Sequence, residues 1–139
     1  MNWDKQTARE WDALGFYYEY DDNFKQWRFF GSRLGLQKYS SLIRSYATDL
    51  TNKEISEHIH IGPYNYLKIM TWDVPIISRD AIAGPLNNLL NLGKHIHNAI
   101  ESTAVGSVVK ISDEYSGGNK AMLLFIILAD DFIPSSIEF

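Results

Sequence analysis

The sequence predicts an α+β fold in which two main helices and a short N-terminal helix pack on a mostly antiparallel sheet of about six strands. Two long segments repeat apolar residues every three or four positions, as amphipathic helices do. Three pairs of strand-like segments are joined by short turn-forming stretches, which is typical of β-hairpins. Helices and hairpins alternate along the chain, and this order favours an α+β domain.

The chain begins with a predicted helix followed by a hairpin. Residues 2–13 carry one apolar stripe at helical spacing, and Gly15 ends the helix. Residues 16–20 are almost wholly aromatic and residues 24–30 form the partner strand. The turn between them starts at Asp21 and contains Asp and Asn, whose side chains bond their own backbone in turns. This first hairpin therefore presents many aromatic side chains.

A long helix and a second hairpin follow. Residues 34–50 place seven apolar residues on one side at helical spacing. Residues 55–61 and 64–72 are predicted strands, and Gly62 and Pro63 form the turn between them. The short connection predicts that these two strands are antiparallel neighbours.

The last part of the chain contains a second long helix and a third hairpin. Residues 73–82 are predicted to be irregular, and Pro85 then starts a helix over residues 85–103. Residues 108–114 and 121–128 are predicted strands joined by a Gly-rich loop. The second of these contains the run MLLFIIL, which is apolar on both faces and predicts a central strand covered on each side.

Length and composition bound the domain count and the compartment. A chain of 139 residues fits one domain, with a helix over residues 1–13 and an α+β core over residues 14–136. The N-terminus has no apolar run behind a basic start, so we expect a cytoplasmic protein without a secretory signal. The longest apolar run, residues 121–129, is far shorter than the ~20 residues of a membrane helix.

The composition also excludes several classes of function. The absence of Cys excludes disulfides, Cys-ligated zinc, iron–sulfur clusters and thiol nucleophiles. A pI near 5.5 argues against nucleic-acid binding, which favours a basic surface. The chain lacks a serine-hydrolase elbow, a phosphate-binding loop and a dinucleotide fingerprint. We therefore expect no cofactor and no enzymatic activity.

The densest cluster of chemically able side chains surrounds Glu57, His58 and His60. On a regular strand Ser56 and both histidines face one side, close enough for the imidazoles to reach one metal ion. Glu57 then faces the other side, and no third ligand is evident. A metal site is therefore an alternative rather than the main interpretation.

Two further histidines lie on the second long helix. His95 and His97 diverge around the helix, so only one of them faces the sheet. His97 lies on the apolar stripe and is expected to be a hydrogen-bonded core residue.

Acidic pairs lie at predicted turns and strand ends. Asp21 with Asp22 and Asp113 with Glu114 are such pairs, and their simplest interpretation is solvated loop charge. A sheet that gathered them at one edge, beside aromatic side chains, would suit a basic protein partner. The aromatic neighbours considered for this edge are Tyr17, Tyr18, Tyr20 and Tyr115, whereas Phe16, Trp27 and Phe29 are expected in the core.

Several short motifs resemble a known family. They are Tyr17-Tyr18-Glu19-Tyr20-Asp21, Trp27-Arg28-Phe29-Phe30-Gly31-Ser32 with Gly35-Leu36, Ser56-Glu57-His58, Gly62-Pro63-Tyr64-Asn65-Tyr66-Leu67, Ile82-Ala83-Gly84, and Asp130-Asp131-Phe132-Ile133-Pro134. Over residues 14–136 the chain resembles immunity proteins of bacterial polymorphic-toxin and contact-dependent inhibition systems. The resemblance implies a non-catalytic cytoplasmic protein, monomeric or homodimeric, that binds and neutralises a cognate toxin.

The expected contact residues lie in the second hairpin and the acidic turns: Glu57, His58, His60, Tyr64, Asp21, Asp22, Asp113 and Glu114. Two other functions stay open from the sequence. One is a small metal-dependent enzyme that uses His58 and His60. The other is a ligand-binding or self-associating module that uses the aromatic hairpin.

Overall fold

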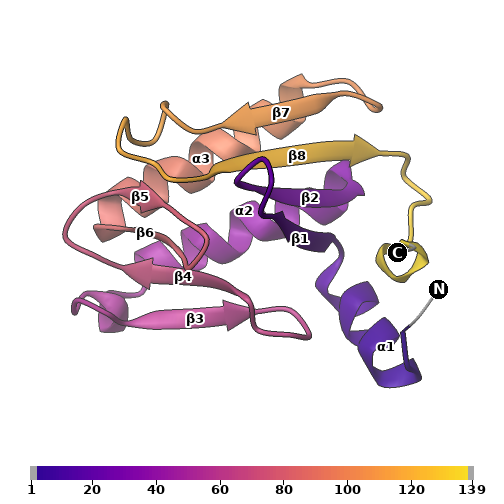
Figure 1. Ribbon diagram of the computed structural model, residues 1–139, viewed down its shortest axis with the longest axis horizontal. Helices are drawn as coiled ribbons and strands as arrows, with labels where there is room; N and C mark the ends of the chain where they lie inside the picture. Colours follow the sequence, from indigo (N-terminus) through magenta and orange to yellow (C-terminus); the bar gives the residue numbers. More distant parts are fainter. Residues whose placement is uncertain (1–2, 138–139) are drawn as a thin grey trace.

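The computed structural model describes residues 3–137, and it confirms the α+β class with three α-helices (Figure 1). The helices are α1 (Lys5–Leu14), α2 (Arg33–Thr48) and α3 (Leu86–Ser102), with short 3-10 turns η1 (Leu50–Asn52) and η2 (Pro134–Ser136). The strands are β1 (Tyr17–Asp21), β2 (Gln26–Ser32), β3 (His58–Ile61), β4 (Leu67–Thr71), β5 (Ile76–Ile77), β6 (Ile82–Gly84), β7 (Val108–Ile111) and β8 (Met122–Leu128). None of the helices in the described part of the chain is both long and apolar enough to cross a membrane.

The strands form two four-stranded mixed sheets, so the prediction of a single, mostly antiparallel sheet of six strands is wrong in this respect. The first sheet has the order β1-β2-β8-β7 and the second the order β3-β4-β6-β5. The three predicted hairpins are confirmed as antiparallel pairs. At the centre of each sheet, however, β2 pairs with β8 and β4 with β6 in parallel. Turn residues specify neighbours within a hairpin but not between hairpins, so these parallel pairs have no local signal.

Element ends differ from the predicted ones where the backbone turns. Residues 55–57 form a turn instead of the start of β3, because Ser56 has φ 78° and the Glu57 N–H donates to the Glu54 carbonyl. Likewise β4 begins at Leu67, since Asn65 has φ 58°. Helix α1 begins at Lys5, where Asp4 caps it by accepting from the Thr7 N–H at 2.7 Å. The predicted start at residue 2 lies outside the described residues.

Helices α2 and α3 cover one side of the first sheet. Alternate residues of β2 and β8 are buried on that side, with Phe29 stacked on Phe125 at 4.7 Å between ring centroids and Tyr39 of α2 packed against Phe29 at 4.6 Å. The expected burial of Phe16, Trp27 and Phe29 is confirmed. The other side chains of β8 are partly exposed, so this strand is central in its sheet but is not covered on both faces.

The two long helices contact each other closely at Gly93. A Cβ at this position would lie 2.6 Å from Cγ of Arg44, and Ser40 Oγ donates to the Gly93 carbonyl at 3.1 Å. Further along, Gln37 Nε2 donates to the His97 carbonyl and Nδ1 of His97 lies 3.0 Å from Gln37 Oε1. His97 is thus the partly buried, hydrogen-bonded residue that its position on the apolar stripe predicts.

Two tyrosines of α2 provide a test of this packing. Tyr39 is fully buried and its hydroxyl has no hydrogen-bond partner among residues 3–137. The Tyr46 hydroxyl instead donates to the Glu57 carbonyl at 2.7 Å and accepts from the Thr71 N–H at 3.1 Å. We expect Tyr39→Phe to raise the free energy of unfolding by about 1 kcal/mol, because it removes an unsatisfied buried group.

Urea unfolding measures this effect, with Tyr46→Phe as the matched control. The control should lower the free energy of unfolding by about 1 kcal/mol, since it removes the hydroxyl's hydrogen bonds to the Glu57 carbonyl and to the Thr71 side chain. Equal effects of the two substitutions would contradict the structure.

Candidate functional site

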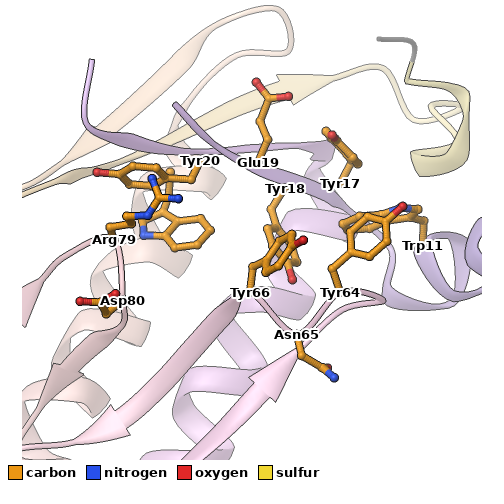
Figure 2. Close-up of a pocket in the computed structure, with 11 residues that line it drawn as sticks. Trp11, Tyr17, Tyr18, Glu19, Tyr20, Tyr64, Asn65, Tyr66, Arg79 and Asp80 are labelled. Carbon is orange, nitrogen blue, oxygen red and sulfur yellow. The ribbon is translucent and has the colours of Figure 1, made fainter. Parts of the chain in front are cut away.

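An open groove of about 670 Å³ lies between the edge of the first sheet and the loops of the second (Figure 2). Strand β1 forms one wall, and the β3–β4 loop and the β5–β6 loop form the other. The lining side chains are mostly aromatic: Trp11, Tyr17, Tyr18, Glu19, Tyr20, Trp27, Tyr64, Asn65, Tyr66, Arg79 and Asp80. Four of them are consecutive residues of β1, so the groove follows the edge of this strand.

Tyr18 attaches the β3–β4 loop to the first sheet. Its buried hydroxyl donates to the Ile61 carbonyl and accepts from the Leu67 N–H at 3.4 Å, so one side chain bonds the end of β3 and the start of β4. Gly62 permits this approach. It has φ 89°, and a Cβ there would lie 2.5 Å from the Tyr18 ring. The base of the groove is therefore a specific contact between the two sheets.

An aromatic cluster closes the end of the groove near α1. Trp11, only 1% exposed, packs against Tyr17, Tyr18 and Tyr64 with ring centroids at 4.7, 5.2 and 6.1 Å. Its buried Nε1 has no hydrogen-bond partner within the described chain. Burial and the nearby Glu19 carboxylate raise the pKa of Tyr17 to about 12, and burial raises the pKa of Tyr18. Both hydroxyls are therefore neutral at physiological pH and able to donate hydrogen bonds.

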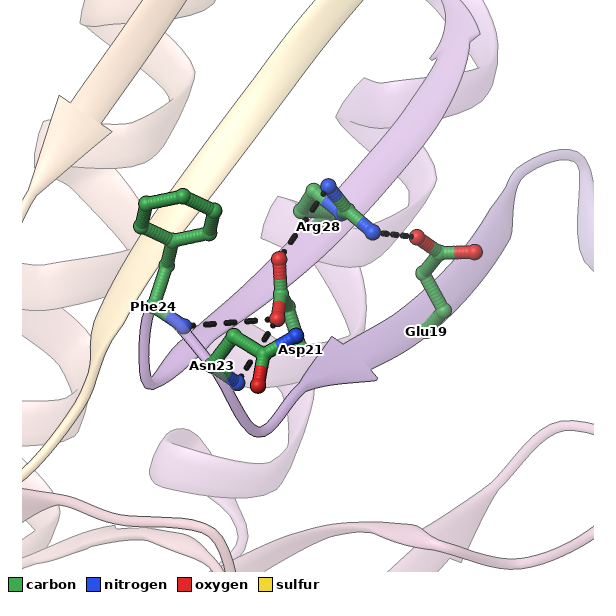
Figure 3. A network of polar contacts seen from close by, with 5 residues as sticks. All are labelled: Glu19, Asp21, Asn23, Phe24 and Arg28. Atoms are coloured by element: carbon green, nitrogen blue, oxygen red, sulfur yellow. Dashed lines mark hydrogen bonds and ion pairs between the residues drawn. The ribbon is translucent and has the colours of Figure 1, made fainter.

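Charged side chains at the opposite end are paired internally. Arg79 forms an ion pair with Asp22 and lies over the Tyr20 ring at 5.3 Å. Arg28 forms ion pairs with Glu19 and Asp21, the latter at 3.3 Å (Figure 3). Asp80, which is exposed at the groove, has no ion-pair partner among residues 3–137.

Asp21 has a local structural role in addition to its ion pair. Its Oδ1 accepts from the N–H groups of Asn23 and Phe24 at 2.9 and 3.3 Å, which holds the β1–β2 turn (Figure 3). The sequence predicts Asp21 and Asp22 as contact residues for a partner, or as solvated loop charge. The structure instead places both in pairs with arginines of the same chain.

The exposed rim of the groove comes from the β3–β4 loop. Tyr64 and Tyr66 are 46% and 70% exposed, their rings lie 5.6 Å apart, and both point from this loop toward β1 (Figure 2). Tyr64 is one of the predicted contact residues, whereas Tyr66 is absent from them. The sequence does contain a signal for an exposed Tyr66. It is the turn at Gly62, followed by two tyrosines, because a turn exposes the side chains beside it.

Glu57, His58 and His60 lie outside the groove lining, and their side chains are exposed. The two histidines share one face of β3 as predicted, with ring centroids 5.1 Å apart. Nδ1 of His58 lies 2.8 Å from the Ser56 carbonyl, and Nδ1 of His60 lies 3.0 Å from the Asn65 carbonyl. His60 therefore supports the loop that carries the rim tyrosines.

A metal centre needs more ligands than these two histidines provide. Within residues 3–137 no three His, Asp or Glu side chains gather in a position to hold a metal ion. The described residues therefore supply no third metal ligand beside His58 and His60.

Asp113 and Glu114 are exposed in the β7–β8 loop. The register places this loop and the β1–β2 turn at the same end of the first sheet, with β2 and β8 between them. The Glu114 carboxylate accepts from the Ser112 N–H at 3.0 Å. The fold thus gathers both acidic turns at one end, but neither Asp113 nor Glu114 lines the groove.

Comparison with known proteins found no match: no protein family, no curated protein and no solved structure is similar to this chain. What the groove can bind is therefore inferred from the residues that line it. An edge strand, a rigid aromatic wall and two exposed tyrosines suit an extended protein segment.

Removal of the Tyr18 hydroxyl tests how the groove is held. We expect Tyr18→Phe to lower the free energy of unfolding by about 1–3 kcal/mol, because the Ile61 carbonyl and Leu67 N–H lose a buried partner. Hydrogen exchange at the Leu67 amide should accelerate more than elsewhere in β4. Tyr20→Phe in the same strand is the matched control, and equal protection in both variants would argue against this contact.

Alkaline pH should weaken the fold through its buried tyrosines. Burial raises the pKa of Tyr17, Tyr18, Tyr39, Tyr46 and Tyr115 above the ordinary value of 10.0. The unfolded chain then ionises first, so the contribution of these tyrosines to stability should be constant below pH 10 and fall above it. Urea unfolding across this range checks the slope, and Tyr17→Phe should reduce it. A free energy of unfolding that stays level above pH 10 would contradict the burial of these groups.

Proposed function

We propose that this protein is an immunity protein that binds and neutralises a cognate bacterial toxin domain, and that the aromatic groove is the contact surface. The observation that carries the proposal is the pair of exposed tyrosines, Tyr64 and Tyr66, above a wall of buried aromatic side chains. Exposed aromatic side chains beside buried ones are typical of the central residues of protein interfaces. The motif likeness to immunity proteins supports the same function.

The groove is organised before any partner binds. Trp11 and Tyr18 are buried and held by several ring contacts, and Tyr18 is hydrogen-bonded to both ends of the β3–β4 loop. A partner therefore meets a surface that loses little conformational freedom on binding. This property favours tight association, which an inhibitor of a toxin needs.

The edge of β1 suggests how the toxin is engaged. β1 pairs with β2 on one side, and its other side borders the groove. An extended toxin segment would add its main chain to this edge and place its side chains against Tyr64 and Tyr66. Asp80 would attract a basic side chain, consistent with the net charge of -4.

The proposal predicts a strong effect of Tyr66→Ala. It also predicts that a neighbouring gene encodes a toxin domain, and this domain, produced separately, should bind the protein. The substitution should raise Kd by more than tenfold, about 1.4 kcal/mol. Calorimetry measures the affinity, and growth of cells producing the toxin domain reports neutralisation.

Trp72→Ala is the matched control. Trp72 is a 37% exposed aromatic residue just beyond the other end of β4, outside the groove, and its replacement should leave Kd unchanged. Equal affinities of the Tyr66 and Trp72 variants would remove the groove from the interface. Absence of any binding between the two proteins would overturn the function itself.

A further inference from the structure

The face of the first sheet that points away from α2 and α3 carries an apolar band along β8, while β2 adds Gln26, Arg28 and Ser32 beside Phe30. Along each strand, the residues of this face alternate with the residues that pack on the helices. All four strands contribute residues to it. The apolar members beyond Tyr17 are Phe30, Val108, Met122, Leu124, Ile126 and Leu128. Val108 is 45% exposed and the other five are partly exposed. We call these six residues the outer patch.

The described chain leaves the outer patch open. Figure 1 shows α2 and α3 on the far side of the sheet, and the segment after β8 runs away toward α1. At α1 this segment is held by Asp12, whose Oδ1 accepts from the Ser135 N–H at 2.9 Å. An apolar surface that crosses the central strands of a sheet is typical of a protein contact.

The strand register places charges at the two edges of this face. One cross-strand row runs from Glu19 through Arg28 and Leu124 to Lys110. Arg28 pairs with both Glu19 and Asp21, so the β1 edge has an excess of one negative charge. Lys110 on the opposite edge is exposed and has no ion-pair partner among residues 3–137. The face is therefore negative at the β1 edge, apolar along β8 and positive at the β7 edge.

A two-fold rotation about an axis parallel to the strands brings such a face onto itself with opposite charges matched. The β1 edge of one copy then faces the β7 edge of the other, so that Glu19 faces Lys110. In the next row Phe30 and Ile126 are neighbours. The rotation places Phe30 of one copy against Ile126 of the second copy, and Ile126 of the first against Phe30 of the second. Two sheets packed in this way lie roughly 10 Å apart with interleaved side chains.

We propose that the outer patch binds a second copy of this chain, forming a face-to-face homodimer of the first sheets. The charge pattern favours a second copy over an unrelated partner, because the same face supplies both members of each pair. The groove also extends to the other side of β1 and stays accessible there in this dimer, although Tyr17 and Glu19 border both surfaces.

Light scattering after gel filtration tests the proposal on the complete chain. We expect a mass of twice 16.0 kDa that falls toward the monomer at low protein concentration and at high salt. Leu124→Arg places a charge opposite Arg28 of the second copy and should give a folded monomer. Leu34→Arg, at a 77% exposed leucine of α2, is the matched control and should remain dimeric. A wild-type mass of 16.0 kDa at every concentration would overturn the proposal.

A cross-link tests the geometry without relying on a variant that disrupts packing. The chain contains no Cys, so Glu19→Cys and Lys110→Cys can be combined without competing thiols. Within one copy these positions are three strands apart, roughly 14 Å, whereas face-to-face packing brings them to roughly 10 Å in the dimer. A rigid thiol-specific cross-linker with a span of about 10 Å should therefore give a covalent dimer. A dimer that this reagent does not cross-link would overturn this arrangement of the faces.

The proposed dimer and the proposed toxin-binding function can be disproved independently of each other. Leu124→Arg should keep toxin affinity if the groove is the binding site. If the monomeric protein instead binds the toxin through the outer patch, Leu124→Arg abolishes toxin binding, and the second copy is the wrong occupant.

Discussion

The Tyr18 hydroxyl is the interaction on which the groove depends. It lies between Ile61 and Leu67, the last residue of β3 and the first of β4, and so joins two sheets that share no strand. The ring also occupies space that only glycine leaves open at position 62. Loss of this buried hydroxyl would remove its bonds to both backbone groups and so weaken the contact between the two sheets. Other contacts assist it, such as Trp27 Nε1 donating to the Ser78 carbonyl at 2.9 Å.

Charge has a smaller part in this surface than its acidic composition suggests. Glu19, Asp21 and Asp22 are matched by Arg28 and Arg79. Partly exposed pairs of this kind contribute little to stability, but they remove free charge from the surface. The groove is therefore mainly an aromatic surface, and Asp80 gives it a single local preference for a basic group. Binding strength would come from buried aromatic area, and charge would contribute mainly to choice of partner.

Both open surfaces of the protein have the same structural origin. The two long helices pack on one side of the sheets, which leaves the outer side of β8 and the edge of β1 without a helical cover (Figure 1). The groove is concave because α1 and the β3–β4 loop border it. The outer patch is flat because only strands contribute to it. A groove suits an extended segment, whereas a flat sheet face suits another sheet.

Local features of the chain were sufficient to predict the helices, the three hairpins, the core positions of Phe29 and Trp27, and the hydrogen-bonded role of His97, since periodicity and turn chemistry act over a few residues. The prediction of Tyr64 as a contact residue likewise came from the second hairpin, and the structure places Tyr64 in the groove lining. Only the tertiary structure decided three further features. These are the parallel pairing of β2 with β8, the insertion of Tyr18 between β3 and β4, and the ion pair of Asp22 with Arg79. Each of these contacts joins residues more than forty positions apart, and no short segment contains both partners. Their formation depends on which hairpins pack together, and that choice is made by the shared core rather than by any local pattern.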